Sequence, residues 1–288
     1  MKRVILKALQ QANDDSTCLD IEQLYGGSIN KSFFVETNNN QYFIKYHPQA
    51  PDHFFEREAE GLARIKETNT IRVPEVLAVS DETDEAFLLM EWVEGEATPH
   101  TEVELGQQIA HMHQSLGEKH GFGKQTYIGK LSQPNGWCSS WLDYYRNQRL
   151  MTQLEYGIQN NRVTGKRRDQ LEKLLSRLDE WIPKDASPSY LHGDLWGGNW
   201  LVGEDGHPYV IDPSFLYGDR HFEIAFTELF GGFSYRFYEA YQDQWPLADD
   251  YADRKPLYQL YYLLVHLNMF GEAYGRDVDV ILNHYLGK

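Results

Sequence analysis

Short apolar segments alternate with polar turns over the first ninety residues, which is the pattern of antiparallel strands. Strands are predicted at residues 21–25, 32–37, 42–46, 76–79 and 87–91. The polar residues 38–41 separate the second strand from the third and predict a β-hairpin. One helix is predicted in this region, beginning at Pro51-Asp52 and running to about Lys66. The pattern therefore predicts a five-stranded antiparallel sheet with a single helix.

The pattern changes to helical spacing after residue 95. Apolar residues then recur at intervals of three and four, and Thr101 with Glu104 predicts a capping box at the start of the first helix. Further helices are predicted at residues 138–158, 167–182, 220–231, 234–244, 256–274 and 277–286. We therefore predict an α+β fold with a small lobe at residues 1–93 and a larger, mostly helical lobe at residues 94–288.

The chain carries 27 Lys and Arg residues against 43 Asp and Glu residues, so its formal net charge is −16. This charge disfavours binding to nucleic acids and anionic membranes, and no run of five or six basic residues opposes it. Cys18 and Cys138 are too few for a disulfide framework and lack the spacing of metal ligands. No apolar segment has the length of a signal-peptide core or a membrane span. We therefore expect a monomeric cytoplasmic protein that binds neither nucleic acid nor membrane.

One β-rich segment, residues 188–212, interrupts the helical pattern and places three polar residues at the ends of short strands. Asp194 and Asn199 lie in the turn between two of these strands, and Asp212 follows the third. Phosphoryl transfer needs such a set, because one carboxylate orients the attacking hydroxyl while an amide and a second carboxylate hold Mg²⁺ against the phosphates. Each residue alone is more typical of a turn. Their order, with His192 two residues before Asp194, matches the kinase catalytic loop and favours ATP and Mg²⁺ as cofactors.

Lys45 and Glu58 supply the partners that such a site requires. Lys45 ends an aromatic strand, where its ammonium group can reach the α- and β-phosphates. Glu58 lies on the apolar stripe of the following helix, where an unpaired carboxylate is costly, so Lys45 is its expected partner. The alternative is that Glu58 only borders the core. The catalytic segment favours the paired interpretation.

Two further segments are candidates for nucleotide contacts. Gly27 and Ser28 lie in a glycine-containing turn before Lys45, where backbone N–H groups can approach phosphates. The alternative is an ordinary hairpin turn, and the segment is not a Walker loop because Gly-Lys-Ser/Thr is absent from it. An apolar strand leads out of the small lobe, and the backbone at Glu91 and Val93 is expected to bind adenine. The alternative there is an ordinary core strand.

With these residues in place, the chain resembles the fructosamine kinase, or ketosamine-3-kinase, family. Leu191 to Asn199 is similar to the family signature, in which Trp196 separates the family from many related kinases. Further similar segments follow at the expected distances, at residues 106–113, 133–135, 137, 212–214, 217–220, 229–233 and 257–261. The resemblance covers nearly the whole chain. It implies the two-lobed, aminoglycoside phosphotransferase-like version of the protein kinase fold.

The resemblance also implies ATP-dependent phosphorylation of a sugar hydroxyl on a fructosamine or ribulosamine, which is an early glycation product. The phosphorylated adduct is less stable, so the activity would reverse the glycation of a protein or metabolite. The first lobe would bind the nucleotide, and the second would catalyse the reaction and bind the acceptor. The implied site residues are the proton acceptor Asp194, the Mg²⁺ ligands Asn199 and Asp212, the phosphate clamp Lys45 and Glu58, and the adenine-binding residues Glu91, Trp92 and Val93.

Two tryptophans flank the catalytic turn. Trp196 is predicted to stack on a sugar face or to fill the core, whereas Trp200 is expected to pack inside its strand. His192 is expected to brace the catalytic loop rather than to transfer protons. His111 and His113 lie on or beside the apolar face of a predicted helix, so we expect them to pack or to form hydrogen bonds rather than to bind a ligand.

Three positions depart from the family pattern. The glycine loop often carries Cys where Ser28 stands, so thiol-based control of this loop is not expected. His221 and Glu223 occupy positions where Glu and Asp are typical. We expect these two residues to lie outside the phosphate machinery and to affect acceptor preference or local packing.

Two alternatives to a ketosamine kinase remain open. The same chemistry could serve another hydroxyl compound, such as an aminoglycoside, choline or homoserine, and the negative charge would suit any cationic acceptor. Trp196 and the similar C-terminal segments favour a ketosamine. The second alternative is a catalytically silent nucleotide-binding scaffold. Such a scaffold is expected to lack Lys45, Asp194, Asn199 or Asp212, and all four are present.

Overall fold

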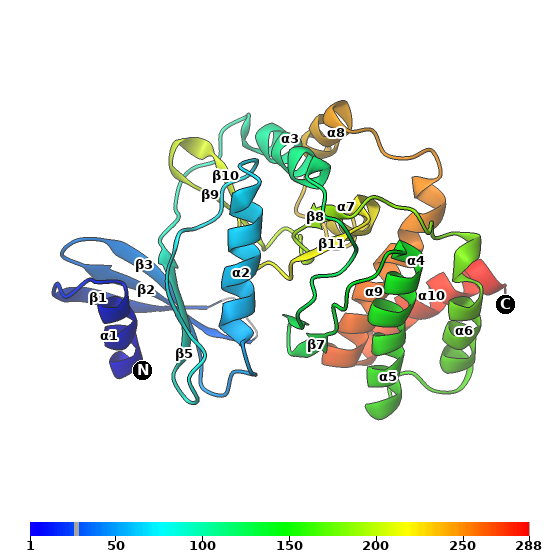
Figure 1. Ribbon diagram of the computed structural model, residues 1–288, viewed down its shortest axis with the longest axis horizontal. Coiled ribbons are helices and arrows are strands. Elements are labelled where there is room, and N and C mark those ends of the chain that lie inside the picture. Colours follow the sequence, from blue (N-terminus) through cyan, green and yellow to red (C-terminus); the bar gives the residue numbers. More distant parts are fainter. Residues whose placement is uncertain (26–28, 288) are drawn as a thin grey trace.

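The computed structural model describes residues 1–25 and 29–287. Figure 1 shows a sheet with two helices at the N-terminal end and a larger, mainly helical part beside it. The N-terminal elements are α1 Lys2–Gln11, β1 Cys18–Leu24, β2 Lys31–Thr37, β3 Gln41–His47, α2 Phe54–Glu67, β4 Val76–Ser80 and β5 Ala86–Glu91. Neighbouring strands are antiparallel and lie in the order β1-β2-β3-β5-β4. The predicted α+β class, the five-stranded antiparallel sheet and its β2–β3 hairpin are confirmed.

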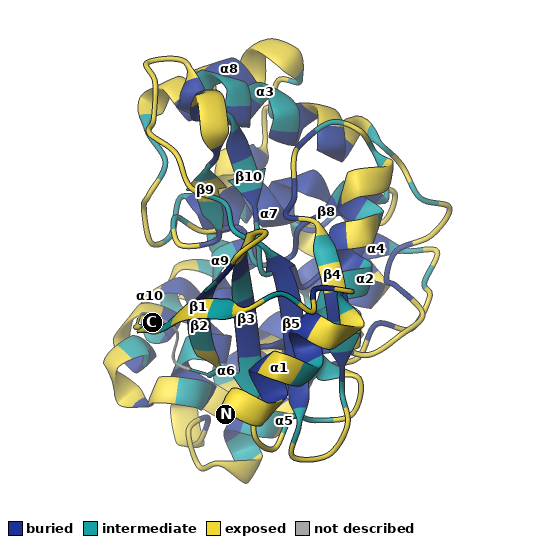
Figure 2. Ribbon diagram, turned by 90° about the vertical axis from the view of Figure 1, so that its left-hand side faces the viewer, coloured by how far each residue is buried: buried dark blue, intermediate teal, exposed yellow. Residues whose placement is uncertain are grey.

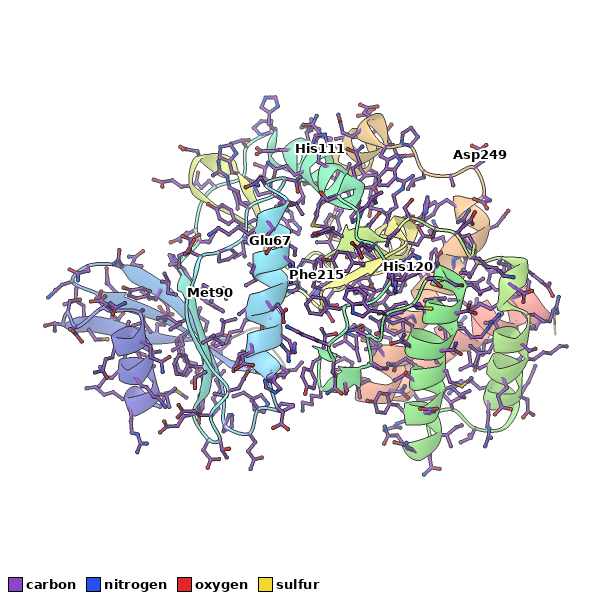
Figure 3. All side chains as sticks on the ribbon, viewed as in Figure 1. Glu67, Met90, His111, His120, Phe215 and Asp249 are labelled. Carbon is purple, nitrogen blue, oxygen red and sulfur yellow. The ribbon has the colours of Figure 1, made fainter. Side chains whose placement is uncertain are left out.

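The two N-terminal helices cover opposite faces of the sheet (Figure 1). Side chains of β5 alternate between these faces because successive residues of a strand point to opposite sides. Phe87 and Leu89 belong to the core cluster under α1, and Leu88 and Met90 belong to the cluster under α2. Figure 3 labels Met90 on β5, next to α2. Both faces of β5 are therefore buried, as the dark strands of Figure 2 show.

The expectation of a single helix in this region is wrong, because α1 was not predicted. Its buried residues Val4, Ile5, Ala8 and Leu9 form one stripe that packs on the sheet. Only Leu6 and Lys7 separate the two buried pairs, and Leu6 is exposed although it is apolar, so the helical spacing repeats only once within ten residues. Tertiary contact with the sheet stabilises a helix that is too short to form alone.

The larger part contains α3 Thr101–Gln114, α4 Trp141–Tyr144, α5 Met151–Gln159, α6 Gly165–Ser176, α7 Arg220–Thr227, α8 Tyr235–Gln244, α9 Tyr251–Phe270 and α10 Gly275–Leu286. A π-helical stretch, η1 Tyr145–Leu150, joins α4 to α5, and 3₁₀ turns occur at η2 Leu178–Glu180, η3 Glu204–Gly206 and η4 Glu272–Tyr274. Each helix predicted after residue 95 is present with shifted ends. Within residues 1–25 and 29–287, no helix has the length and apolar composition needed to cross a membrane.

Six short strands hold the centre of this part together. They are β6 Thr126–Ile128, β7 Leu131–Gln133, β8 Ser189–Leu191, β9 Trp200–Val202, β10 Pro208–Val210 and β11 Leu216–Gly218. β6 pairs with β7, β9 with β10, and β8 with β11, each time antiparallel. The β9–β10 hairpin thus lies between β8 and β11 in the sequence. This topology brings the β8–β9 loop close to the β10–β11 loop.

The capping box predicted for α3 is wrong. His100 is the N-cap residue, and its side chain makes no capping hydrogen bond. The Thr101 hydroxyl accepts the Thr98 N–H at 2.8 Å and donates to the Gly206 carbonyl at 2.7 Å. A tertiary hydrogen bond to the β9–β10 turn therefore replaces the predicted local one.

Aromatic side chains from α4, η1, α7 and α9 pack among aliphatic residues in the core of the larger part. Trp141, Tyr145 and Tyr258 are fully buried, and the Trp141 Nε1–H donates to the Tyr258 hydroxyl at 3.0 Å. The Trp141 and Tyr145 rings are stacked with their centroids 5.7 Å apart. Large rings with satisfied polar atoms contribute much apolar area to a core, and this core supports the loops described next.

Candidate active site

Asp194 and Asn199 lie in the loop between β8 and β9. The Asn199 Nδ2 donates to the Asp194 carbonyl oxygen at 2.8 Å and to Asp194 Oδ2 at 3.2 Å. Because the amide nitrogen is engaged in this way, the amide oxygen is left to face another partner. Asn199 is buried and Asp194 is half-buried. The loop therefore presents one carboxylate and one amide oxygen in a fixed relation.

Asp212 lies in the β10–β11 loop, directly beside the first loop. The Ile211 N–H donates to the Asn199 carbonyl at 3.0 Å, and a Cβ on Gly193 would come within 2.0 Å of the Ser214 carbonyl oxygen. Glycine is therefore required at this close approach. Asp212 itself has a φ of 57°, a left-handed conformation that is uncommon for a residue with a side chain. Such strain often occurs at functional sites, and here it accompanies the approach of the three predicted residues.

Lys45 on β3 lies between two carboxylates. Its Nζ is 2.6 Å from Glu58 Oε1 and also forms an ion pair with Asp212. Burial alone lowers the pKa of Lys45, but the charges of Asp212 and Glu58 outweigh this effect and raise the pKa above the usual lysine value. Lys45 is therefore charged at neutral pH. The structure brings together the two residues that the sequence paired and adds Asp212 as a second partner.

A glycine on α2 allows Glu58 to reach this position. A Cβ on Gly61 would lie 3.0 Å from Pro213 Cγ and 3.1 Å from Phe215 Cβ, so α2 already packs tightly on the segment after Asp212. Figure 3 shows Phe215 beside α2. A larger residue at position 61 would move the helix away and separate Glu58 from its partners.

The pKa of Asp194 is raised well above the usual aspartate value. Burial is the largest cause, the Asp212 carboxylate adds to it, and the hydrogen bond from Asn199 acts in the opposite direction. A carboxylate with a raised pKa is a stronger base than an ordinary one. Asp194 is thus suited to accept a proton from an alcohol.

These polar groups line one cavity of about 460 Å³. Lys45, Asp194, Asn199 and Asp212 all contribute to its wall, and so does Trp196. The other lining side chains are mostly apolar or aromatic and include Ile29, Ile128, Phe226, Phe230, Val265, His266, Met269, Phe270 and Tyr274. Gly27 and Ser28, which were predicted to approach phosphates, lie outside the described residues. The cavity offers a polar site for phosphates and a mainly apolar site for a second molecule.

A smaller, mainly apolar cavity of about 210 Å³ also has Asp212 in its wall. Glu91, Trp92 and Val93, the segment expected to bind adenine, line it together with Leu24, Phe43, Pro74, Met90, Leu201 and Ile211. The Trp92 ring packs edge-on against Phe34 with the centroids 4.8 Å apart. Because both cavities share Asp212, a nucleotide base in the smaller one would direct its phosphates toward the larger one.

Glu223 on α7 holds the catalytic loop. Its carboxylate accepts the N–H of His192 at 3.0 Å, the N–H of Gly193 at 2.5 Å and the Nε2–H of His113 at 2.9 Å. Glu223 does not line the cavity that the predicted phosphate-site residues share, and it acts on local packing, one of the two effects expected for it, by binding the backbone of the loop that carries Asp194. The sequence did carry a signal, namely a single charge inside the apolar run 222–226. A buried charge of this kind needs strong partners.

The two histidines of this network serve as neutral hydrogen-bonding residues. Burial is the largest cause that lowers the pKa of both His113 and His192. Because His113 donates through Nε2, its Nδ1 accepts the Tyr241 hydroxyl at 2.8 Å. His192 donates through Nε2 to the Ile211 carbonyl at 2.7 Å and accepts the Asp194 N–H through Nδ1 at 3.2 Å. These contacts agree with the expected bracing role of His192.

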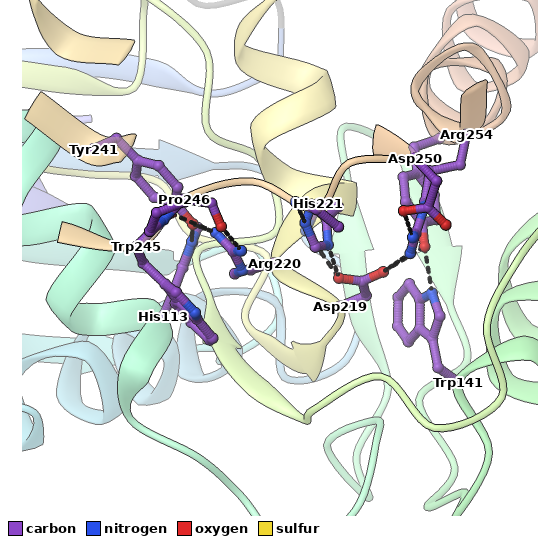
Figure 4. A network of polar contacts seen from close by, with 12 residues as sticks. His113, Trp141, Asp219, Arg220, His221, Tyr241, Trp245, Pro246, Asp250 and Arg254 are labelled. Carbon is purple, nitrogen blue, oxygen red and sulfur yellow. Dashed lines mark hydrogen bonds and ion pairs between the residues drawn. The ribbon is translucent and has the colours of Figure 1, made fainter. Parts of the chain in front are cut away.

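His221 belongs to a buried polar network at the start of α7 (Figure 4). Asp219 Oδ1 accepts both the backbone N–H of His221 at 3.0 Å and its Nδ1–H at 2.7 Å. Asp219 Oδ2 accepts the Tyr258 hydroxyl at 2.5 Å and lies 3.9 Å from the Arg254 guanidinium. His221 therefore acts on the local packing of α7, which is one of the two effects expected for it.

The two tryptophans of the catalytic turn differ in exposure. Trp196 is 42% exposed and lies against the backbone of Gly198, where a Cβ would come within 2.4 Å of the ring. Trp200 is half-buried and packs against Phe233 with the ring centroids 6.5 Å apart. His111 is exposed on α3 (Figure 3). Trp196 is thus open to the cavity, whereas Trp200 contributes to packing as expected.

The side-chain oxygen atoms of Asp212 and Asn199 are suitable ligands for a Mg²⁺ ion that binds together with a nucleotide. Asp212 offers a carboxylate and Asn199 an amide oxygen, and both line the larger cavity. Mg²⁺ prefers such hard oxygen ligands and takes few of them from the protein, because phosphate oxygens and water complete its octahedron. With Lys45 and Asp194 in the same wall, the arrangement can bind a nucleoside triphosphate and deprotonate an alcohol.

The whole chain, residues 1–288, matches the family model described as fructosamine kinase. An Enterococcus faecium protein named "Probable ketoamine kinase" is 38% identical over 262 residues, which cover 90% of this chain and 93% of that protein. A crystal structure from Thermobifida fusca whose name refers to fructosamine-3-kinase is 31% identical, with a TM-score of 0.89 and 100% coverage of both chains. The choline kinase LicA from Streptococcus pneumoniae, at 14% identity, shares the fold with a TM-score of 0.64 and 98% coverage of both chains. The chain therefore belongs to the fructosamine kinase family of phosphotransferases that act on a hydroxyl group, with a protein kinase-like fold, as the sequence predicted.

Proposed function

We propose that this protein transfers the γ-phosphate of ATP to a sugar hydroxyl of a fructosamine or ribulosamine. The observation that carries the proposal is the convergence of Lys45, Asp194, Asn199 and Asp212 on one cavity, which Trp196 also lines. Membership of the fructosamine kinase family supports a ketosamine as the acceptor. The product would be less stable than the substrate, so the activity would reverse early glycation of proteins or metabolites in the cytoplasm.

Asp194 is proposed to accept the proton of the attacking hydroxyl. Its raised pKa favours this role, and its contact with the Asn199 amide orients the carboxylate. General base catalysis of this kind contributes about 10²- to 10⁴-fold to a rate. Glu223 and His192 are proposed to act as positioning residues, because they bind the backbone of the same loop.

Asn199 and Asp212 are the proposed ligands of Mg²⁺. When bound, the ion would neutralise charge on the phosphate oxygens as the γ-phosphate is transferred. Lys45 is proposed to bind the α- and β-phosphates, and its contact with Glu58 at 2.6 Å fixes the direction of its ammonium group. Asp212 would then exchange Lys45 for the metal as its main partner.

The nucleotide is proposed to bind to the lobe formed by residues 1–93. Adenine would occupy the cavity of about 210 Å³, with the backbone of Glu91 and Val93 at its polar edge and Trp92 in its wall. Gly27 and Ser28 are proposed to contact the phosphates. Residues 94–288 would then supply the base, the metal ligands and the acceptor site.

The test is Mg²⁺-dependent release of ADP with fructoselysine and a ribulosamine as acceptors. Aminoglycosides, choline and homoserine serve as competing acceptors, and the Asp194→Asn variant controls for background hydrolysis. We expect turnover with the ketosamines only. Turnover with only a competing acceptor would replace the proposed substrate class. Tight ATP binding without turnover of any hydroxyl compound would instead indicate a silent scaffold.

A further inference from the structure

Four aromatic rings from the C-terminal elements form a continuous group on the wall of the active cavity. Phe230 follows α7, His266 and Phe270 lie on α9, and Tyr274 lies in η4. The centroid of the His266 ring lies 4.6 Å from that of Phe230, 5.0 Å from that of Tyr274 and 5.6 Å from that of Phe270. We call these four residues the aromatic cluster. Its members contact one another, and all four line the larger cavity.

The aromatic cluster is not an ordinary part of the core. Phe230 is 41% exposed and Phe270 is 52% exposed, whereas Phe222, Phe226 and Phe237 on the neighbouring helices are buried. Rings that border a cavity and remain exposed keep apolar surface in contact with water, which costs free energy unless a partner covers it. Their position in the wall of the catalytic cavity indicates that the partner is a ligand of that cavity.

One residue ties the aromatic cluster to the catalytic loop. The Tyr262 hydroxyl donates to the Gly193 carbonyl at 3.1 Å, and the Tyr262 carbonyl accepts a hydrogen bond from His266 Nδ1 at 2.8 Å. The Tyr262 ring also stacks on Phe226, with the centroids 3.6 Å apart. The cluster is therefore held at a fixed distance from the residue next to Asp194.

The charge of the cavity favours a cationic ligand. A carbonyl oxygen only accepts hydrogen bonds, so His266 Nδ1 carries the hydrogen and Nε2 remains an acceptor. Burial lowers the pKa of His266, which keeps its ring neutral at pH 7. Among the described lining residues, the one permanent cation is Lys45, and Glu58 and Asp212 already pair with it. The carboxylates of Asp194 and Asp212 face the same space.

We propose that the aromatic cluster is the subsite for the amine end of the acceptor, where it holds a protonated secondary ammonium and the apolar group attached to it. This inference rests on the proposed ketosamine kinase function and adds the chemical class of the amine. The faces of aromatic rings attract ammonium groups, and the exposed Phe rings cover apolar substituents. Preferred substrates are therefore glycated amines whose nitrogen bears an apolar alkyl or benzyl group, which the exposed Phe rings can cover.

The first test compares two acceptors on the wild-type enzyme. We expect kcat/KM for 1-deoxy-1-benzylamino-fructose to exceed that for 1-deoxy-1-methylamino-fructose by about tenfold or more, because only the benzyl group is large enough to cover the exposed rings. The ratio should persist when the ionic strength rises, since salt screens charges and not apolar contacts. Equal or inverted preference between the two acceptors would overturn the proposal.

The second test removes single rings. Phe230→Ala and Phe270→Ala are each expected to raise KM for the benzyl ketosamine about tenfold, with kcat and the KM for ATP within about twofold of wild type. Tyr235→Ala is the matched control, because Tyr235 is 75% exposed on α8 and lies outside the cavity wall. If Phe270→Ala lowers Tm strongly, Phe270→Leu keeps most of the volume, removes the ring and should still raise KM.

The two proposals fail in different ways. Phosphorylation of the benzyl ketosamine with unchanged KM in both ring variants would overturn the aromatic subsite and leave the ketosamine kinase proposal standing. Absence of ketosamine phosphorylation by the wild-type enzyme, with ATP bound, would overturn both. A KM increase in Tyr235→Ala equal to that in the ring variants would also contradict the aromatic subsite, since it would show a general effect on the fold.

Discussion

The proposed phosphate side and the proposed acceptor side of the cavity are built in different ways. On the phosphate side, charged and polar groups hold one another: Lys45 lies between Glu58 and Asp212, and Asn199 binds Asp194. On the acceptor side, the aromatic cluster leaves two rings partly exposed and depends on ring contacts. Buried charges tolerate little displacement, whereas apolar contact is non-directional. A phosphate site can therefore stay rigid while the acceptor wall accommodates differently shaped amines.

The largest effect is expected from Asp194→Asn. This change should lower kcat about 10³-fold because it removes the base, while ATP still binds. It should also raise the free energy of unfolding by about 1 kcal/mol, because a buried carboxylate with a raised pKa opposes folding at neutral pH. Steady-state kinetics, nucleotide titration and thermal unfolding check the three effects. Asp249→Asn, at an exposed position labelled in Figure 3, is the control. If the activity of Asp194→Asn stayed within tenfold of wild type, Asp194 would not be the catalytic base.

Asp212→Asn should weaken the Mg²⁺-dependent part of nucleotide binding by about 100-fold, as loss of groups at metal sites commonly does. The backbone should tolerate the change, since Asn readily adopts the left-handed conformation of Asp212. Asp205→Asn is the matched control, because Asp205 has a similar φ of 62° but is exposed. Titration of ATP with and without Mg²⁺ measures the effect, and an unchanged Mg²⁺ response would exclude Asp212 from the metal site.

Glu223→Gln should lower kcat about tenfold and leave the KM for ATP unchanged, because an amide cannot accept three N–H groups as the carboxylate does. Glu223→Ala should cost about 3 kcal/mol of stability, since it leaves buried donors without a partner. Denaturant unfolding and steady-state kinetics check these values. Glu239→Gln, at an exposed position on α8, is the control. Wild-type kcat in Glu223→Gln would show that the contacts to the loop do not position it.

The smallest effect concerns pH and the stability of the phosphate side. The pKa of Asp194 is raised in the folded state, so its contribution to stability is present at low pH and is lost as pH rises through that raised pKa. Asp194→Asn lacks this titration. The stability advantage of the variant should therefore grow as pH rises from about 4, the ordinary aspartate pKa, through the raised value. Denaturant unfolding of both proteins across this range measures it, and a constant difference would contradict the raised pKa.

The spacing of apolar residues predicted much of the fold. The predictions that were wrong concern features that tertiary contacts decide. Strands β2, β3 and β5 and the long helices carry enough residues to show their period. The helix α1 has only ten residues, and the capping pattern at Thr101 was local, so tertiary contacts decided both. The partners of Glu223 could not be named from the sequence for a similar reason, because His113 and His192 are far from it in the sequence.

The sequence by itself identified the residues proposed for phosphate chemistry. Asp194, Asn199 and Asp212 lie within 19 consecutive residues, and short strands with turns between them bring such neighbours together by local rules. Lys45 and Glu58 were paired because a carboxylate on an apolar stripe needs a cation. Only the tertiary structure assembled the aromatic cluster and added Asp212 to the Lys45 pair. Contacts between distant residues depend on how helices pack, and helix packing depends on side-chain shapes along the whole length of each helix rather than on any one motif.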